Sequence, residues 1–439
     1  MPGKPNSKHL DHEPHDQEQL RQIQLEGLKW TVKHAYYGSS FYRNRFDQNG
    51  IKPEDIKTLD DLKRLPFTTA QDLRLGYPLP LLSVPTDKII RIHSSSGTTG
   101  KRKILSYTQK DVEDWTNFFA RCYRMAGVGP GDRVQIAVGY GLWTAGVGFQ
   151  AACERVGAMA IPVGPGNIGM QCQFLMDLKS NVLCCTSSMA LLLAEEVNRR
   201  GIRDKINIKT VIQGSERCSA AMCNAIKELL GAQHVFDITG MTELYGPGAG
   251  IDCQYHTGIH YWADYYILEI LDPDTLEPVP PGKIGEMVVT TLRKEASPLI
   301  RYRTRDLTRI IEGKCPCGSI FPRHDKILGR SDDMFIFRGV NIYPGQIDEI
   351  LSGIEGVSSE YNIILDRREG KDFMMIRVER AIEGNPSWDD DIEREIKTQV
   401  KQEIMVSCEV QIVDYATLPR SERKSRRVFD RRMEQGIDL

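Results

Sequence analysis

The chain has 439 residues, of which 41% are hydrophobic and 26% are charged, and its formal net charge is −2. This composition is typical of a globular protein with two or three domains, and the small net charge argues against nucleic acid or an anionic membrane as a partner. No apolar run reaches the roughly 18 residues that a membrane-spanning helix needs, and residues 1–19 lack the apolar core of a secretion signal. We therefore expect a cytoplasmic protein that begins with a flexible tail over residues 1–19.

The eleven cysteines predict free thiols. Their number is odd, and several of them, including Cys153, Cys172, Cys184 and Cys185, stand in apolar surroundings. Cysteine at such positions usually behaves as a small buried hydrophobe. A disulfide framework is not expected in a large chain without a secretion signal.

Residues 20–64 are predicted to be mainly helical, because aromatic and leucine positions recur at helical spacing. From about residue 88 to 300, apolar strand-like runs alternate with amphipathic helices. This alternation predicts an α/β fold with mostly parallel, buried strands. The expected strands are 88–92, 103–107, 134–138, 158–163 and 182–186, and the expected helices are 190–199 and 220–230.

A change in composition near residues 313–333 marks a predicted domain boundary. Two turn-rich segments, Gly313–Gly318 and Gly329–Asp333, follow one another there. Beyond them, a compact pattern predicts a small α+β domain, with helices at 345–352 and 389–404 and strands at 361–365, 373–378 and 409–413. We place the boundary at Arg330–Asp332. This gives a large N-terminal domain over residues 20–329 and a small C-terminal domain over residues 330–439.

The segment Ser94–Lys101 contains three Ser, two Thr, two Gly and one Lys between two predicted strands. Such a turn can surround phosphate oxygens with backbone N–H and hydroxyl donors. It is not a Walker A loop, because Gly-x-x-x-x-Gly-Lys-[Ser/Thr] is absent and no helix follows at once. A polar hairpin loop is the alternative interpretation of this segment.

Four further segments follow in a recognisable order: Gly214–Glu216, Asp237–Glu243, Tyr302–Asp306 and the basic stretch Pro419–Arg427. Together with Ser94–Lys101, this order resembles the adenylate-forming (acyl-CoA synthetase) superfamily, and within it the phenylacetate–CoA ligase branch. The chain is also similar to coenzyme F390 synthetase. The resemblance implies a large N-terminal domain and a small mobile C-terminal domain. It also implies two half-reactions: a carboxylate attacks ATP to give acyl-AMP and pyrophosphate, and the thiol of coenzyme A then displaces AMP.

The resemblance assigns most of the candidate residues to ATP. The β- and γ-phosphates would lie against Ser94, Ser95, Ser96, Gly97, Thr98, Thr99, Gly100 and Lys101. The nucleotide would also be bordered by Gly214, Ser215, Glu216, Asp237, Thr239, Gly240 and Met241. Thr242 would contact the α-phosphate, and Glu243 would bind Mg²⁺, which needs one or two carboxylates in addition to phosphates. Asp306 would accept hydrogen bonds from both ribose hydroxyls, and Arg330 would contact ribose or phosphate.

The same resemblance gives roles to the acyl pocket and to the mobile domain. Tyr140 and Gly141 would border the acyl group, although Tyr140 also fits a core aromatic at a strand end. Asp332 matches the hinge residue of the C-terminal domain. With Thr242 and Glu243, Lys424 would complete the catalytic set, because a compact ammonium suits two converging anions. Its basic neighbours Arg423 and Arg426 are alternatives.

Three positions depart from the pattern of the family. Thr239 stands where an aromatic residue commonly stacks on adenine, and Arg217-Cys218 stand where close relatives have Pro-Trp. Arg423 replaces the glycine that normally precedes the catalytic lysine. These departures leave open the acid specificity and the strength of nucleotide binding.

A metal site is predicted at Cys315 and Cys317, which form a closely spaced pair in a tight turn. The resemblance adds Cys253 and His260, and the four side chains would make a closed Cys₃His set suited to structural zinc. His256 is a competing ligand. A hairpin turn with two free thiols is the alternative interpretation.

We therefore expect an ATP-dependent carboxylate–CoA ligase that uses Mg²⁺ and carries structural zinc. Its substrates would be coenzyme A and a small carboxylic acid, of the aryl type such as phenylacetate, and by analogy it would form a homodimer. Three alternatives stay open. The first is an adenylyltransferase of the coenzyme F390 synthetase type, and the second is an enzyme that passes its acyl group to a carrier protein or an amine. The third is an inactive nucleotide-binding relative.

Overall fold

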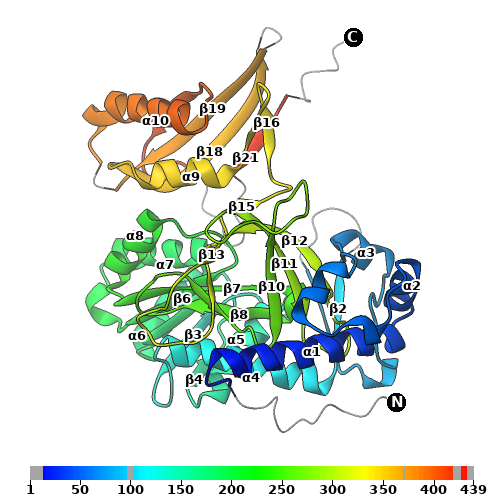
Figure 1. Cartoon of the computed structure of the whole chain (residues 1–439). Coiled ribbons are helices and arrows are strands. Elements are labelled where there is room, and N and C mark those ends of the chain that lie inside the picture. Colours follow the sequence, from blue (N-terminus) through cyan, green and yellow to red (C-terminus); the bar gives the residue numbers. More distant parts are fainter. Residues whose placement is uncertain (1–12, 96–101, 369–370, 383, 419–426, 433–439) are drawn as a thin grey trace. The chain divides into compact units, whose positions relative to one another are not determined.

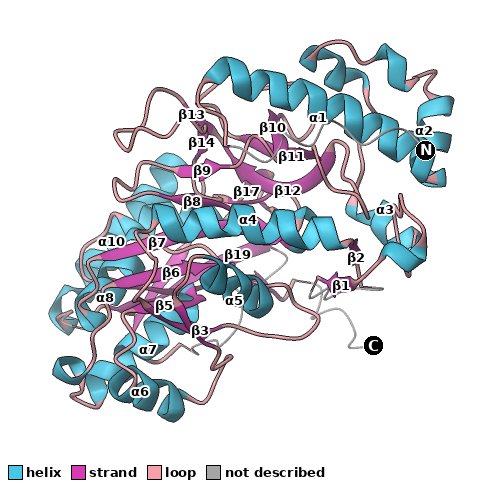
Figure 2. Ribbon diagram, turned by 90° about the horizontal axis from the view of Figure 1, so that it is seen from below, coloured by secondary structure: helices cyan, strands magenta, loops and turns pink. Residues whose placement is uncertain are grey.

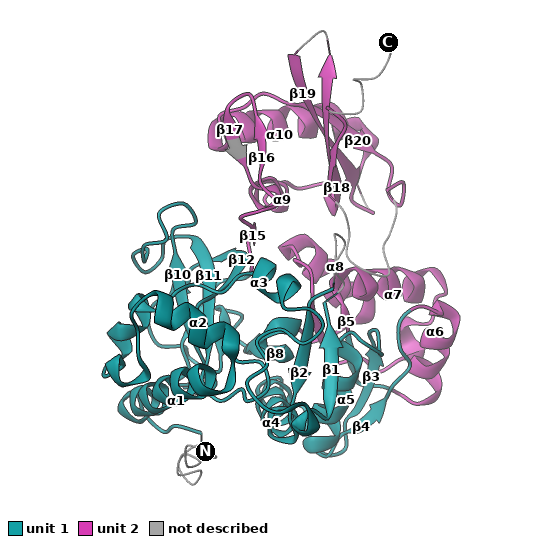
Figure 3. Ribbon diagram, turned by 90° about the vertical axis from the view of Figure 1, so that its right-hand side faces the viewer, with its two compact units in different colours: residues 1–165, 180–184, 236–326 teal, residues 166–179, 185–235, 327–439 magenta. Residues whose placement is uncertain are grey.

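The computed structural model describes residues 13–95, 102–368, 371–382, 384–418 and 427–432 (Figure 1). The chain forms two compact units, shown in teal and magenta in Figure 3. Unit 1 comprises residues 1–165, 180–184 and 236–326, and unit 2 comprises residues 166–179, 185–235 and 327–439. The predicted division into residues 20–329 and 330–439 stays a prediction.

The helices of unit 1 begin with the region that was predicted to be helical. Asp16 caps α1 (Gln17–Gly38), since its carboxylate accepts the N–H of Gln19. The apolar stripe of α1, which includes Leu20, Ile23 and Leu28, is buried as its spacing predicts. The chain continues through α2 (Ser40–Gln48), the short turns Pro53–Asp55 and Leu59–Arg64, α3 (Ala70–Leu75), the turn Thr86–Lys88, α4 (Gln109–Met125) and α5 (Ala145–Arg155).

The first strands of unit 1 agree with the sequence pattern. β1 (Arg91–Ser94) and β2 (Ile104–Tyr107) form an antiparallel pair on either side of the glycine-rich segment. β3 (Arg133–Ala137) and β4 (Met159–Ile161) pair in parallel, with the helix α5 between them in the chain. β5 (Val182–Thr186) has the predicted bounds.

The later strands of unit 1 pair antiparallel, so the expectation of mostly parallel strands was wrong for this part of the chain. β7 (His234–Met241), β8 (Gly246–Asp252), β9 (Ile259–Tyr261), β14 (Arg323–His324) and β13 (Ile310–Ile311) are neighbours in that order. A separate antiparallel meander contains β10 (Tyr266–Leu271), β11 (Gly285–Thr291) and β12 (Tyr302–Thr308). The physical reason is the connection, because turns and loops without crossover helices link these strands.

Helix α4 packs closely against β8, as Figure 2 shows. Two glycines of β8 allow this approach. A Cβ atom on Gly246 would lie 2.6 Å from the ring of Trp115, and one on Gly248 would lie 2.4 Å from the ring of Phe119. Both glycines also have positive φ angles, of 144° and 91°. The glycine-rich run after Glu243 therefore serves packing and turn geometry together.

Unit 2 contains α6 (Ile168–Asp177), α7 (Ser187–Arg199), the turn Arg203–Lys205, β6 (Thr210–Gly214) and α8 (Ala220–Leu230). Its C-terminal part continues through β15 (Gly329–Arg330), β16 (Phe335–Phe337), β17 (Val340–Ile342), α9 (Pro344–Ser352), β18 (Val357–Arg368), β19 (Lys371–Arg380), the turn Pro386–Trp388, α10 (Asp389–Glu403), β20 (Glu409–Val413) and β21 (Val428–Asp430). The last four strands form one sheet in the order β20-β19-β18-β21. α9 and α10 pack on it and share an aliphatic core with it (Figure 1). The α+β pattern expected here is confirmed, and the hairpin β16–β17 and strand β21 are additional.

The sequence argued against a membrane-spanning helix and against a disulfide framework. In the described part of the chain, no helix has both the length and the apolar character needed to cross a membrane. All eleven cysteines are free thiols, and Cys153, Cys172, Cys184 and Cys185 are buried. Their predicted role as small core residues is confirmed.

Candidate functional site

The turn at Thr242 and Glu243 is the centre of the candidate site in unit 1. The two residues follow the end of β7 in a short 3₁₀ turn (Thr242–Leu244), and both side chains are buried. The carboxylate of Glu243 forms an ion pair with Lys103 and accepts a hydrogen bond from the hydroxyl of Tyr302 at 3.1 Å. Burial tends to raise the pKa of Glu243, but the charge and hydrogen bond of Lys103 outweigh it, and the pKa is lowered. An ionised carboxylate at this turn is a suitable ligand for Mg²⁺.

Lys103 and Tyr302 are functional candidates that the sequence analysis missed. Lys103 follows the glycine-rich segment by two residues, and the sequence offered Lys101, Arg102 and Lys103 as neighbouring basic side chains with no signal to choose between them. The side chain of Lys103 is 17% exposed, so its ammonium is held at the turn rather than in solvent. Ser96, Gly97, Thr98, Thr99, Gly100 and Lys101 lie outside the described residues.

Ser94 and Ser95 are described, and their environment is unusual for serine. The hydroxyl oxygens of both residues are buried and have no hydrogen-bond partner within the described protein. Buried polar atoms are normally paired. The N–H of Ser94 and the ring of His93 both donate to the carbonyl of Leu142, at 2.9 and 3.2 Å. These bonds fix the start of the glycine-rich segment and leave the two hydroxyls available to a ligand.

The same contacts bring the predicted acyl-pocket residues near this segment, since Leu142 directly follows Tyr140 and Gly141. Gly141 has a positive φ of 91°. The hydroxyl of Tyr140 is buried without a partner in the described protein. A Cβ atom on Gly146 would lie 2.6 Å from the Tyr140 ring, so a glycine is required there. The first turn of α5 therefore packs directly against the Tyr140 ring.

Asp306 lies in an irregular part of β12. The pairing of β12 with β11 steps from Arg303, opposite Val288, to Leu307, opposite Glu286, so β12 carries two extra residues in this interval. Arg305 has a positive φ of 71° within it. Bulges of this kind redirect side chains and are frequent beside active sites. The buried carboxylate of Glu286 stabilises the bulge through ion pairs with Arg303 and Arg305, at 2.8 and 3.4 Å.

The remaining residues of unit 1 predicted to border the nucleotide line β7. The N–H of Asp237 donates to the carboxylate of Asp252 at 2.8 Å. Thr239 stands opposite Gly250 of β8, and Gly240 and Met241 stand opposite Pro247 and Gly246. The pairing is irregular between Thr239 and Gly240. This irregularity leads directly into the turn that presents Thr242 and Glu243.

Unit 2 holds the other predicted nucleotide and hinge residues. Gly214 ends β6, and Ser215 and Glu216 follow it, with a positive φ of 73° at Ser215. The carboxylate of Glu216 accepts the N–H of Ser188 at 2.8 Å and so caps the start of α7.

Arg217, which departs from the pattern of the family, pairs with Asp348 at 2.9 Å. Arg330 and Asp332 pair with each other at 2.8 Å, and both side chains are exposed. The predicted hinge residue is therefore ion-paired with the arginine that was predicted to contact ribose or phosphate. Lys424 lies outside the described residues.

A cluster of cysteine and histidine side chains forms a candidate metal centre. The ligand atoms of Cys253, His260, Cys315 and Cys317 all lie within 4.8 Å of one another. The sulfur atoms of Cys253 and Cys315 are 3.5 Å apart, and the sulfur of Cys317 is 3.4 Å from Nε2 of His260. A tetrahedral zinc ion with bonds of about 2.3 Å to sulfur and 2.0 Å to nitrogen gives ligand separations close to these values. The residues therefore fit zinc.

The hydrogen bonds around the cluster show whether His260 or His256 is its fourth member, which the sequence left open. Nδ1–H of His260 donates to the carbonyl of Phe321 at 3.1 Å, which directs its Nε2 toward the sulfur atoms. Such a second hydrogen bond is typical of metal-binding histidines. His256 instead bonds through Nδ1 to the carboxylate of Asp252 at 2.5 Å. His260, not His256, is the fourth member of the cluster.

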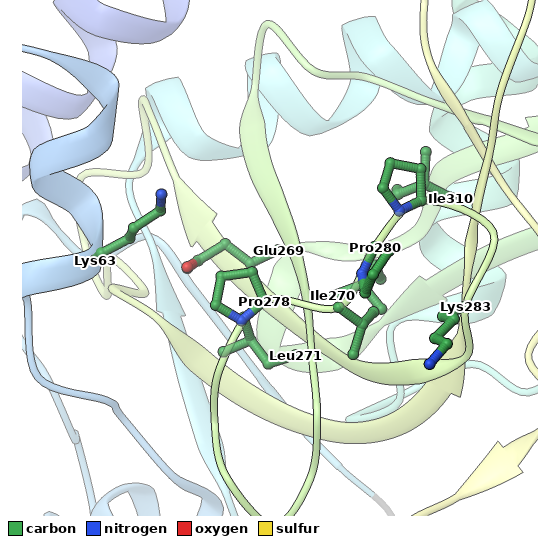
Figure 4. Close-up of a pocket in the computed structure, with 10 residues that line it drawn as sticks. Lys63, Glu269, Ile270, Leu271, Pro278, Pro280, Lys283 and Ile310 are labelled. Atoms are coloured by element: carbon green, nitrogen blue, oxygen red, sulfur yellow. The ribbon is translucent and has the colours of Figure 1, made fainter.

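A shallow pocket of about 200 Å³ lies elsewhere in unit 1 (Figure 4). Its lining includes Lys63, Glu269, Pro278, Pro280 and Lys283. Among the described residues, none of the predicted site residues lines it. This pocket is therefore not part of the candidate site.

Comparisons with known proteins cover almost the whole chain. Residues 48–292 match the model of the AMP-binding enzyme family, and residues 339–432 match that of the AMP-binding enzyme C-terminal domain. The chain is 39% identical to the phenylacetate-coenzyme A ligase of Escherichia coli strain K12, covering 94% of this chain and 95% of that protein. It is 40% identical to the phenylacetate-coenzyme A ligase of Pseudomonas putida, covering 94% of each. A solved structure of 2-hydroxyisobutyryl-CoA ligase in complex with 2-HIB-AMP has a TM-score of 0.87 at 27% identity, covering 97% of this chain and 95% of that one.

Proposed function

Since the chain belongs to the AMP-binding enzyme family, and within it to the phenylacetate–coenzyme A ligase branch, we propose that it is an ATP-dependent, AMP-forming acid–CoA ligase acting on an aryl acid such as phenylacetate. The fold is the mixed α/β adenylate-forming fold, with a large N-terminal and a small C-terminal domain. The observation that carries the proposal is the buried turn at Glu243. It holds an ionised carboxylate against Lys103, which directly precedes the strand that follows the glycine-rich segment.

During adenylation, the site must stabilise the negative charge that develops on the phosphate groups as pyrophosphate leaves. A carboxylate oxygen of the acid attacks the α-phosphorus of ATP, and the bond to the leaving pyrophosphate breaks. In our proposal Lys103 and the hydroxyls of Ser94 and Ser95 stabilise the phosphate charge as it develops. Glu243, with phosphate oxygens and water, holds Mg²⁺, which neutralises part of that charge when bound. Thr242 donates its hydroxyl to the α-phosphate.

Further residues of the proposal orient the nucleotide and complete the reaction. The bulge in β12 directs Asp306 to the ribose hydroxyls, and Lys424 bridges the acid carboxylate and the α-phosphate. In the second half-reaction the sulfur of coenzyme A attacks the acyl carbon, and AMP leaves. The relative solved in complex with 2-HIB-AMP supports an acyl-adenylate intermediate for this fold.

The proposal is tested by pyrophosphate release with Mg·ATP across a panel of aryl and aliphatic acids, with and without coenzyme A. We expect release that depends on one class of acid, with free AMP and an acyl-CoA accumulating only when coenzyme A is present. AMP attached covalently to a product would instead identify an adenylyltransferase. Release without any use of coenzyme A would indicate a different acyl acceptor.

We also propose that Cys253, His260, Cys315 and Cys317 bind one structural zinc ion. Four protein ligands fill a tetrahedral site and leave no position for a substrate. The cluster joins the end of β8, the strand β9 and the turn between β13 and β14. A metal there would cross-link these three segments of the chain.

The purified protein should therefore contain about one zinc ion per chain. Cys315→Ser is expected to remove most of the metal and to lower the melting temperature by roughly 5 °C or more, because the strands lose their cross-link. Elemental analysis and thermal unfolding measure the two effects. Cys408→Ser, which changes a thiol outside the cluster, is the matched control. A folded wild-type protein without bound metal would refute the zinc proposal.

A further inference from the structure

A fully buried lysine lies directly beneath the turn that carries Thr242 and Glu243. Lys294 is 0% exposed, and its ammonium donates a hydrogen bond to the main-chain carbonyl of Glu243 at 3.0 Å. It follows β11 in the run Arg293-Lys294-Glu295, which from sequence is typical of a solvated surface. Its burial therefore requires a structural or functional explanation.

Aromatic rings and nearby carboxylates accommodate the charge of Lys294. Its ammonium is 4.9 Å from the ring centroids of both Tyr107 and Tyr245, which is a cation–π arrangement. The buried carboxylate of Asp111 accepts the N–H groups of Glu295 and Ala296, at 2.7 and 2.9 Å, and so anchors the backbone next to Lys294. Burial lowers the pKa of Lys294 to about 8, while the carboxylates of Asp111 and Glu243 oppose this change.

Tyr107 also contacts the main chain of the same turn. Its hydroxyl lies 2.7 Å from the carbonyl of Tyr245 and 3.2 Å from that of Thr242. Tyr107 and Lys294 together therefore hold the main-chain carbonyls of three turn residues, Thr242, Glu243 and Tyr245. Tyr245 has a positive φ of 74°, which is an uncommon conformation for a tyrosine. The backbone of the turn keeps this conformation because its surroundings fix it.

We infer that Lys294 is a positioning residue for adenylation, which sets the direction of the Glu243 carboxylate by holding its main chain. This inference rests on the proposed function. A methionine would fill a similar volume without the cost of desolvating a charge. The protein is therefore less stable with a lysine at this position than it would be with an apolar side chain. The lysine instead fixes the backbone of the turn. Lys294 acts through Glu243 and does not itself touch the substrate.

The test compares Lys294→Met with the wild-type enzyme in both half-reactions. Adenylation is followed by ATP–pyrophosphate exchange at a series of Mg²⁺ concentrations, and thioester formation is started from synthetic acyl-AMP. We expect kcat for exchange to fall about tenfold or more and the Mg²⁺ concentration for half-maximal rate to rise, because the carboxylate is misdirected. Thioester formation should change less than about threefold. Lys283→Met, an exposed lysine in the same unit, is the matched control and should behave as wild type.

A second variant keeps the test decisive if Lys294→Met does not fold. Tyr107→Phe removes the hydroxyl that contacts Thr242 and Tyr245 but keeps the ring beside the ammonium, and it should show the same pattern with a smaller loss. Wild-type exchange rates and Mg²⁺ dependence in a folded variant of either kind would overturn the inference, as would equal loss in both half-reactions. No exchange by the wild-type enzyme with any acid would overturn the proposed function and this inference together.

Discussion

Glu243→Gln is expected to slow adenylation by about 10²–10³-fold, the loss typical of removing one group that stabilises developing charge. The glutamine keeps the size and one oxygen acceptor of the glutamate but loses its negative charge. Lys103 would then lie beside a neutral amide, and Mg²⁺ would lose its carboxylate ligand. We expect the Mg²⁺ concentration for half-maximal ATP–pyrophosphate exchange to rise along with the loss of rate.

The control for this variant separates catalysis from folding. Glu243 is buried and paired, so its replacement also changes stability. Thermal unfolding of the variant shows whether it is folded at the assay temperature. Glu277→Gln makes the same chemical change at an exposed position of unit 1 and should have no effect. A folded Glu243→Gln variant with wild-type exchange and Mg²⁺ dependence would remove Glu243 from the proposed mechanism.

Lys424→Ala is expected to slow adenylation by a similar factor, about 10²–10³-fold, while thioester formation from synthetic acyl-AMP falls less than about tenfold. The asymmetry follows from its proposed role, because the lysine bridges the two anions that react only in the first half-reaction. Lys424 lies outside the described residues, and the prediction rests on its motif within the matched C-terminal domain of the family. The two half-reactions are measured separately on the same preparation.

Two kinds of control are available for Lys424. Lys401→Ala changes an exposed lysine on α10 and should leave both half-reactions unchanged. Arg423→Ala and Arg426→Ala test the neighbouring basic side chains. If either arginine variant reproduces the selective loss and Lys424→Ala does not, the motif has been assigned to the wrong residue. Equal loss in both half-reactions for Lys424→Ala would also contradict its role.

The local parts of the fold could be predicted because their signal is local. Helix α8 and strands β5 and β20 have the bounds that their residue patterns predicted. Strand β21 was missed because it is three residues long, and its identity depends on parallel pairing with β18, more than sixty positions away. The antiparallel pairing of the later strands of unit 1 was missed for a related reason. Strand direction is set by connections that the apolar pattern does not encode.

In the candidate site, too, some residues could be predicted from the sequence and others could not. Cys253, His260, Cys315 and Cys317 could be grouped because their residue types are restricted and their motifs are recognisable, and the structure brings them together. Lysines carry no such signal. Lys103 reaches Glu243 across 140 positions, and Lys294 stands in a charged run that is expected on the surface. The burial of Lys294 depends on Asp111 and on two tyrosines that other elements supply, and the spacing of residues in the sequence does not reveal these contacts.

The most direct test of the proposed acid–CoA ligase activity is to trap the acyl-adenylate intermediate. The enzyme is incubated with Mg·ATP labelled at the α-phosphate and with phenylacetate or another acid selected from the panel, in the absence of coenzyme A. We predict that the label accumulates in an enzyme-bound acyl-AMP and is released as AMP when coenzyme A is added, with acyl-CoA formed in equal amount. Label that attaches to an acceptor other than the acid carboxylate, or acyl-AMP that does not react with coenzyme A, would contradict the account.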